Sequence, residues 1–276
     1  MIYNMPEYWL MKNAELTEPY LTFSSPSSFT LKVNDATKHW DGTLEYSTDA
    51  SAWSTWDGTT TLSSANNNGE HVLYLRGTGN TVIAGNSPNY KWVLTGSNIG
   101  CIGNIENLLD YATVESGEHP KMETNCYRYM FRDCTSLTQA PELPATTLAS
   151  YCYRSMFDGC TSLTQAPALP ATTLKIECYR SMFRDCTSLT QAPALPATTL
   201  TDGCYSSMFE GCTSLKLSAT QTGEYTQEYR IPTSDTGTGT TATNALTSMF
   251  TSTGGTFTGT PEINTTYYLS NTNTVV

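Results

Sequence analysis

The sequence predicts a mainly β protein of the α+β class, in which an N-terminal β-sandwich precedes a capped solenoid of stacked repeats. Two observations carry this prediction. Near-identical units recur every 26 residues from Cys126 onward, and self-similarity at a fixed short period is the signature of a solenoid. All five tryptophans lie before residue 93 and all nine cysteines lie after residue 100. This change places a domain boundary near residues 95–100.

The first region, residues 19–99, alternates short apolar runs with turn signals such as Asp-Gly, Asn-Gly and Ser-Pro. Six or seven strands in about 80 residues favour an immunoglobulin-like β-sandwich, since two sheets must cover each other's apolar faces. We expect Trp53, Trp56 and Trp92 in core or edge packing rather than in a ligand platform. Residues 1–18 are expected to form an arm. The expected strands are 20–23, 29–33, 43–46, 52–55, 71–76 and 90–94.

Each repeat unit has a definite internal plan. Copies begin at Cys126, Cys152 and Cys178; the first and third differ at two of 23 positions, as do the second and third, and a fourth copy fades after residue 215. CYRYMFRDCTSL predicts a short amphipathic helix ending at Asp133, where the copies carry Asp or Gly and tolerate a left-handed conformation. LTQAPELP predicts a short extended segment, because prolines forbid helix and limit strand hydrogen bonds.

Both ends of the repeats have the character of caps, so that the solenoid spans residues 100–276 with its repeats at 126–215. The Thr/Gly-rich and C-terminal cap segment is 216–276. Its Ser-Met-Phe at 248–250 matches the units' own Ser-Met-Phe and predicts a degenerate closing unit. Residues 265–269 predict a final edge strand. The first cap, 100–125, carries an apolar run at Ile102, Ile105, Leu108 and Leu109.

The charge of the chain disfavours several partners. Charged residues make up 14% of the chain and the net charge is −11, whereas nucleic-acid binding needs clustered Lys and Arg. An anionic membrane surface is disfavoured for the same reason. No stretch of 18 apolar residues is available for a membrane span. We therefore expect neither nucleic-acid binding nor membrane insertion.

The cysteines come in pairs eight residues apart, four times over, with Cys101 left over. A metal site favours short Cys-x-x-Cys or Cys/His clusters, and eight helical residues would separate the α-carbons of a pair by about 12 Å, too far for a disulfide. Bridges between neighbouring units stay open, beside the interpretation of each cysteine as a reduced, small apolar filler. His39, His71 and His119 share no catalytic spacing. We expect no metal, no cofactor and no catalytic residue.

Side chains that recur in every unit are the candidates for ligand binding. Two interpretations stay open: the tyrosines flank the core and the arginines are solvated, or equal groups at equal intervals grip a repetitive ligand such as a polysaccharide. The acidic balance favours a neutral polysaccharide or a protein receptor over a strongly anionic polysaccharide. Differences between copies gather at 149–151, 175–177 and 201–203, which predicts a variable rim. The candidates are Tyr127, Arg128, Gln139, Tyr153, Arg154, Gln165, Tyr179, Arg180 and Gln191.

The pattern Met-Phe-x-x-Cys-Thr-Ser-Leu, followed by Pro-x-Leu-Pro, resembles the BspA-type leucine-rich repeats of bacterial surface proteins, which also occur in phages. The resemblance covers about 100–270, and Leu-Glu-Tyr-Ser-Thr-Asp at 44–49 is similar to the β-domain that often precedes such repeats. It implies a leucine-rich-repeat-type solenoid and binding or adhesion, often to host surfaces or glycans, without catalysis. In the second unit the matching residues are Met156, Phe157, Cys160, Thr161, Ser162 and Leu163.

The sequence therefore predicts a non-enzymatic binding protein. The first hypothesis is a phage tail or other virion-surface component that recognises a bacterial surface glycan or protein receptor and binds other virion proteins through its N-terminal region. The first 20 residues carry one cation and no apolar run, unlike a secretory signal, which favours this hypothesis. The second is a bacterial cell-surface adhesin of BspA type that binds a host protein or glycan. An enzyme is the third class, and no recognised catalytic motif supports it.

Overall fold

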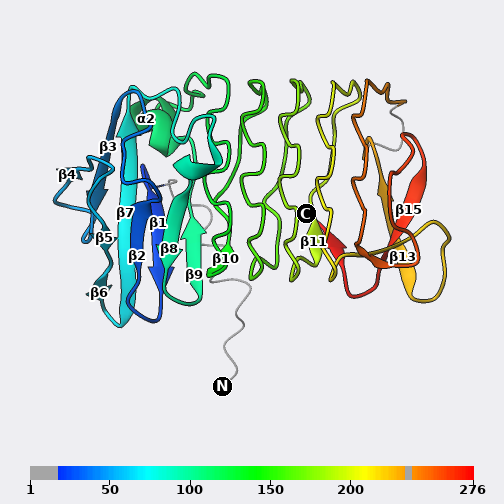
Figure 1. Cartoon of the computed structure of the whole chain (residues 1–276), viewed down its shortest axis with the longest axis horizontal. Coiled ribbons are helices and arrows are strands. Elements are labelled where there is room, and N and C mark those ends of the chain that lie inside the picture. Colours follow the sequence, from blue (N-terminus) through cyan, green and yellow to red (C-terminus); the bar gives the residue numbers. More distant parts are fainter. Residues whose placement is uncertain (1–17, 234–237) are drawn as a thin grey trace.

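The computed structural model describes residues 18–233 and 238–276, so the expected arm at 1–18 lies, except for its last residue, outside the described residues. The protein is mainly β, and the sheets of the described residues are four in number, none closed into a barrel. Figure 1 shows two sheets at the N-terminal end, a row of repeat units in the middle and a further sheet at the other end. The C-terminus returns to the middle of that row.

The larger N-terminal sheet runs in the order β10-β9-β1-β7-β3-β4, with β6 also paired to β7, and the smaller one in the order β5-β2-β8. All six expected strands form, within two residues of their expected ends. A 3-10 helix, η1 (Pro88–Tyr90), precedes β8. The strands are β1 (Leu21–Ser25), β2 (Thr30–Val33), β3 (Thr43–Ser47), β4 (Ser54–Thr55), β5 (Leu62–Ser63), β6 (Ala65–Asn67), β7 (Glu70–Thr78), β8 (Trp92–Thr95), β9 (Ile99–Ile102) and β10 (Leu137–Gln139).

Alternating burial gives these strands a core face. In β1, Leu21, Phe23 and Ser25 are buried and the residues between them are half-buried, as the two-residue period of a strand requires. Trp56 and Trp92 are buried and meet edge to face with ring centroids 5.4 Å apart. Trp53 is half-buried under the guanidinium of Arg76. The expected packing role of the tryptophans is confirmed.

Helix α2 (Asn107–Glu115) is the one α-helix of the described residues, and no helix there is long and apolar enough to cross a membrane. It lies directly against β7. A Cβ at Gly77 would sit 1.8 Å from the carbonyl oxygen of Leu108, so only glycine permits this approach.

The hydrophobic core continues through residues 95–100. Strand β9 pairs with β1 on one side and with β10, from the first repeat unit, on the other, and the buried side chains of both regions form one cluster. Within the expected apolar run of 102–109, Ile105, Leu108 and Leu109 are buried. Ile102 is 46% exposed and lies outside the core, because the other face of β9 points inward.

The first part of each unit is a run of turns, and the expected short helix is wrong. No residue from 125 to 134 is helical. Left-handed backbone recurs at every fourth residue, Asn125, Tyr129 and Asp133, with φ of 66°, 64° and 61°, and an α-helix cannot contain such residues. The left-handed conformation expected at Asp133 is confirmed. Four-residue turns place side chains on one side at a spacing close to helical 3.6, which explains the misleading pattern. We call 125–134 and its equivalents the turn segments.

Alternate residues of a turn segment hydrogen-bond in different directions. Even-numbered N–H groups, such as that of Arg128, donate to the carbonyl three residues earlier in the same unit. Odd-numbered ones donate to the following unit: Tyr127 to the Cys152 carbonyl at 2.9 Å and Tyr153 to the Cys178 carbonyl at 3.0 Å. Five such bonds join each unit to the next. Every second backbone donor is therefore satisfied only by a neighbouring unit, and we call the array the repeat stack.

Identical side chains pack on one another inside the stack. Rings of the phenylalanine column from Phe131 to Phe250 stack with centroids 5.5–5.8 Å apart. The second cysteine of each unit donates its thiol backwards, as Cys160 does to the Phe131 carbonyl at 3.1 Å. All nine cysteines are unpaired and buried, so their expected place as small fillers of the core is confirmed.

The extended segments form only short strand pairs, as their prolines predict. Strand β10 pairs in parallel with β9, and Gln165 forms a parallel bridge with Gln191. Strand β11 (Gln191–Ala192) pairs in parallel with β16 (Thr274–Val275), the last strand of the chain.

Trp92 takes the place of a repeat phenylalanine at the start of the stack. The backbone N–H of Trp92 donates to the Met130 carbonyl at 2.7 Å, as the backbone N–H of Phe131 donates to the Met156 carbonyl in the next unit. Its carbonyl accepts the Cys134 thiol at 3.3 Å, and its ring meets the Phe131 ring edge to face. The N-terminal region thus supplies the backbone partners of a unit that precedes the first.

The far end is closed by the expected fifth unit. Residues 243–251 accept five hydrogen bonds from the fourth unit, and Phe250 stacks on Phe209 at 5.5 Å. A four-stranded sheet of order β13-β15-β12-β14 follows. The expected edge strand at 265–269 is wrong in position, because β15 lies between β13 and β12. The strands are β12 (Lys216–Ser218), β13 (Tyr225–Arg230), β14 (Gly254–Gly255) and β15 (Thr266–Ser270).

Candidate binding surfaces of the repeat units

The tyrosine candidates belong to the core. The rings of Tyr127, Tyr153 and Tyr179 are at most 1% exposed and stack with centroids 5.5–5.8 Å apart and planes within 8° of parallel. Burial raises the pKa of all three hydroxyls well above the ordinary value. The expected ligand-binding role of these tyrosines is therefore wrong, since no ligand reaches their rings. The equivalent tyrosine of the fourth unit, Tyr205, is buried as well.

The arginine candidates form a half-exposed row on the stack. We call Arg128, Arg154 and Arg180 the arginine row. Glu177 pairs with both Arg154 and Arg180, and its Oε1 lies 3.1 Å from Nη1 of Arg180. Burial lowers the pKa of Arg154, and the neighbouring arginines lower it further. The Coulomb interaction with Glu177 opposes this shift. One carboxylate therefore faces two guanidinium groups.

Arg128, at the first end of the row, has no carboxylate partner among the described residues. Its guanidinium donates to the side-chain oxygen of Asn125 at 3.0 Å and to the hydroxyl of Tyr129 at 2.9 Å. The rings of Tyr129 and Tyr151 lie 4.7 and 5.7 Å from it, close enough for cation–π attraction. The row therefore carries local positive charge on an acidic protein.

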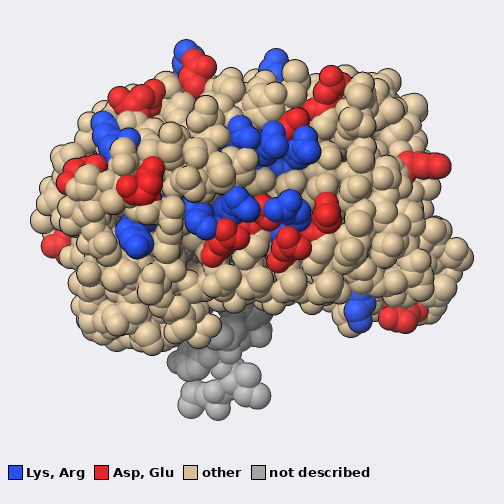
Figure 2. Space-filling view, in the orientation of Figure 1, with Lys and Arg blue, Asp and Glu red and all other residues tan. Residues whose placement is uncertain are grey.

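A second charged row lies beside the first, and the sequence analysis missed it. Positions 132, 158, 184 and 210 carry Arg, Asp, Arg and Glu, so the sign alternates along the stack. Asp158, whose side chain is 5% exposed, lies 3.3 Å from Arg132 and 2.9 Å from Arg184. Burial raises the pKa of Asp158 and both arginines oppose that shift. In Figure 2 the blue and red groups gather over the middle of this face. Comparison of equivalent positions between copies would have revealed this row.

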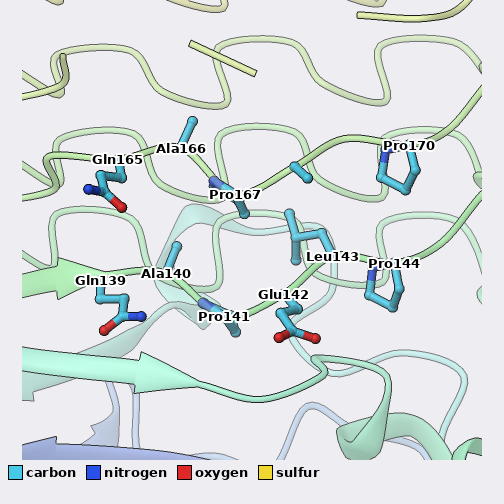
Figure 3. A pocket seen from close by; sticks show the side chains of 11 residues that line it. Gln139, Ala140, Pro141, Glu142, Leu143, Pro144, Gln165, Ala166, Pro167 and Pro170 are labelled. Atoms are coloured by element: carbon cyan, nitrogen blue, oxygen red, sulfur yellow. The ribbon is translucent and has the colours of Figure 1, made fainter. Parts of the chain in front are cut away.

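The glutamine candidates lie on a different surface. Gln139 and Gln165 are exposed and line a groove of about 340 Å3 between the extended segments of the first two units, together with prolines such as Pro141 and Pro167 (Figure 3). We call this the glutamine groove. Gln191 is half-buried in β11, beside the C-terminal strand.

The groove lies where neighbouring extended segments are not joined. Among the described residues, no backbone hydrogen bond links 137–144 to 163–170, whereas Thr190 donates to the Thr164 carbonyl at 2.9 Å between the second and third units. Glu142 is the one charged side chain of the lining, and its equivalent in the second unit is Ala168. The groove therefore offers amides and apolar proline rings to a ligand.

A carboxylate–histidine pair with a buried carboxylate lies outside the repeats. Nδ1 of His119 is 2.7 Å from the carboxylate of Glu106, which is 2% exposed. Burial raises the pKa of Glu106, and His119 opposes this shift. The pair ties the start of α2 to the segment after it. Within residues 18–233 and 238–276, no group of three or more His, Cys, Asp or Glu could hold a metal ion.

No family model, no curated protein and no solved structure matches this chain. The surfaces must therefore be interpreted from their own geometry and chemistry.

Proposed function

We propose that this chain is a non-enzymatic binding protein of a phage tail or virion surface. Its repeat stack recognises a bacterial surface glycan or protein receptor, and its N-terminal region contacts other virion proteins. The resemblance of its repeat motif to BspA-type repeats, which occur in bacterial surface proteins and in phages, supports the setting. We further propose that residues 126–215 form a leucine-rich-repeat-type solenoid and residues 19–99 an immunoglobulin-like sandwich.

The observation that carries the proposal is the regular presentation of equal exposed groups. Ring spacings of 5.5–5.8 Å set one step of the stack, and each of the first three units repeats a half-exposed arginine on one surface and a glutamine on another. A ligand with its own chemical repeat can engage several steps at once, so that weak contacts add by multivalency. The arginine row and the glutamine groove are the two surfaces that fit this mode.

The experiment measures binding of the full chain to whole bacterial cells and to a glycan array. One variant carries Arg128→Ala, Arg154→Ala and Arg180→Ala; a second carries Gln139→Ala, Gln165→Ala and Gln191→Ala. We expect at least one of them to lose tenfold or more in affinity. A charge-matched control, with Lys32, Lys38 and Lys121 replaced by Ala, should bind as the parent does, and thermal unfolding checks that each variant is folded.

Unchanged binding by both variants would mean that the stack only spaces the N-terminal region from its partner. Glycan cleavage during the assay would contradict the non-enzymatic role. Detection of the chain by mass spectrometry in purified virions tests the setting, and its presence only in cell envelopes would contradict it.

A further inference from the structure

A hollow lies at the end of the arginine row, where the repeat pattern is broken. Ser206 stands in the fourth unit at the position that Arg128, Arg154 and Arg180 occupy in the first three. Because serine is smaller than arginine, a hollow of about 350 Å3 lies beside Arg180. We call it the end hollow. It is lined mainly by Glu177, Arg180, Asp202, Ser206, Asn244 and Thr247.

Two further departures from the repeat pattern contribute to the end hollow. Gly203, with φ of 60°, replaces the larger residues found before the leading cysteine of earlier units, and a Cβ there would lie 3.0 Å from Cγ of Glu177. The opposite wall comes from the closing unit, whose hydrogen bonds with the fourth unit span 40 residues instead of 25, as from Gly203 to Thr243. The end hollow therefore occurs once, whereas the row beside it repeats.

The lining is polar and carries both donors and acceptors. Arg180 uses one guanidinium nitrogen on Glu177 and has further N–H donors. Asp202 accepts one backbone N–H, from Thr243 at 3.2 Å, through one of its two oxygens. The hydroxyl of Thr247 donates to the Asn244 side chain at 3.4 Å, a long bond that a ligand group can replace. Hydroxyls that both donate and accept match this mixture.

The charges of the lining set the class of ligand. Arg180 lines the hollow with the carboxylates of Glu177 and Asp202, and Arg154 also pairs with Glu177. The charges around the hollow therefore balance, so a ligand with its own net charge gains no net Coulomb attraction there. No large apolar or aromatic side chain lines the hollow, although such anchors dominate protein–protein contacts. The volume fits the lower end of small-molecule sites. A neutral, hydroxyl-rich ring meets these conditions.

We propose that the end hollow holds one sugar residue of a neutral glycan, whose chain continues along the arginine row. The inference rests on the proposed binding function and adds the ligand class and the place where it is anchored. Arg180 donates to ring hydroxyls while Asp202 and Glu177 accept from them. Ser206 and Gly203 act by leaving room.

The test restores the repeat. Ser206→Arg fills the end hollow with the residue that the three preceding units already carry in the same backbone setting, so the variant should fold with an unchanged melting temperature. Ser28→Arg, at an exposed position of the N-terminal region, adds the same charge elsewhere. Binding is measured on an array of neutral and uronate-containing oligosaccharides, followed by titration of the full chain with the neutral oligosaccharide bound best. We expect Ser206→Arg to weaken its binding at least tenfold and Ser28→Arg to leave it within twofold.

Each other outcome overturns part of the argument. Neutral-glycan binding that survives Ser206→Arg removes the end hollow as the site and leaves the proposed function standing. Binding of uronate-containing glycans alone overturns the ligand class. Binding to cells but to no glycan points to a protein receptor and overturns the inference. Binding to neither cells nor glycans overturns the inference and the proposed function together.

Discussion

The N-terminal sheets and the repeat stack fill their shared core in opposite ways. In the sheets, Trp40, Trp56 and Trp92 meet at interplanar angles of 33° and 73°, and each ring has surroundings of its own. In the stack, tyrosine and phenylalanine rings lie within 8° of parallel on copies of themselves. The sheets depend on shape complementarity among different residues, whereas the stack depends on one fit repeated at every step.

The two regions also differ in how their backbone hydrogen bonds are satisfied. Antiparallel strands in the sheets satisfy one another within the region, as β1 does with β7. A turn segment sends every second N–H to the next unit, so an uncovered end would leave donors or acceptors unpaired. Because of this difference, the stack needs end structures that offer the same backbone partners as a unit. Trp92 supplies these partners at one end and the closing unit supplies them at the other.

The largest effect should come from the residue that belongs to both regions. Trp92→Ala removes a buried ring and is expected to lower the free energy of unfolding by about 3–5 kcal/mol. Trp53→Ala, at a half-buried position, is the control and should cost clearly less. Tryptophan fluorescence reports on the N-terminal region and thiol labelling on the stack, since the two residue types are segregated at residues 93 and 100. Coincident transitions in denaturant are expected; separate ones would show that the regions fold independently.

Alkali should destabilise the protein through the buried cysteines of the stack. Burial raises the pKa of Cys204 to about 11 and that of Cys134 to about 12. Below the unfolded value of about 8.5 the associated stability is fully present, and it is lost as pH rises through the folded values. We expect the melting temperature to fall steadily above pH of about 9, with all nine thiols labelled only after unfolding. A melting temperature that does not change above this pH, or rapid labelling of the folded chain near neutrality, would contradict the burial of these cysteines.

Two stacked tyrosines of neighbouring units, Tyr127 and Tyr153, should respond to removal of the hydroxyl with opposite sign. The Tyr127 hydroxyl donates to the Ile105 carbonyl at 3.2 Å, so Tyr127→Phe should cost about 0.5–1.5 kcal/mol. The Tyr153 hydroxyl is buried without a hydrogen-bond partner, so Tyr153→Phe should raise the free energy of unfolding by up to about 1 kcal/mol. Chemical denaturation of the two variants measures both. Equal losses in the free energy of unfolding would mean that the tyrosine stack is sensitive to any change of side-chain shape, whether or not the hydroxyl is hydrogen-bonded.

The smallest effect is expected at an exposed ion pair between the two regions. Lys121 and Glu123 lie 2.6 Å apart, with side chains 74% and 47% exposed. Such pairs gain little in high dielectric and are screened by salt. Glu123→Gln should leave the melting temperature unchanged at low and at moderate salt. A clear loss that disappears with added salt would show that this contact helps to join the sheets to the stack.

Much of the fold followed from residues that dictate local backbone. The strands at 21–25 and 43–47 follow from two-residue alternation, and the short extended segments follow from Pro141 and Pro144. The left-handed backbone at Asp133 follows from residue types that tolerate it. The period of 26 and the Ser-Met-Phe at 248–250 located the units and their closing copy. Recurrence also selected the arginine and glutamine candidates, which the structure shows to be exposed or half-exposed.

The rest of the fold and of the candidate site depends on contacts between segments that are distant in the sequence. The turn segments and a helix share nearly the same side-chain period, and the inter-unit hydrogen bonds of residues such as Tyr129 favour the turns. These same turns bury the tyrosines that recurrence alone could not separate from a ligand surface. The end hollow has a sequence signal in Ser206 and Gly203, but its far wall arrives only when residues 243–251 close the stack. Local patterns record which backbone a residue tolerates, whereas the partner of an N–H or the wall of a hollow is chosen by chain segments that meet only in the folded protein.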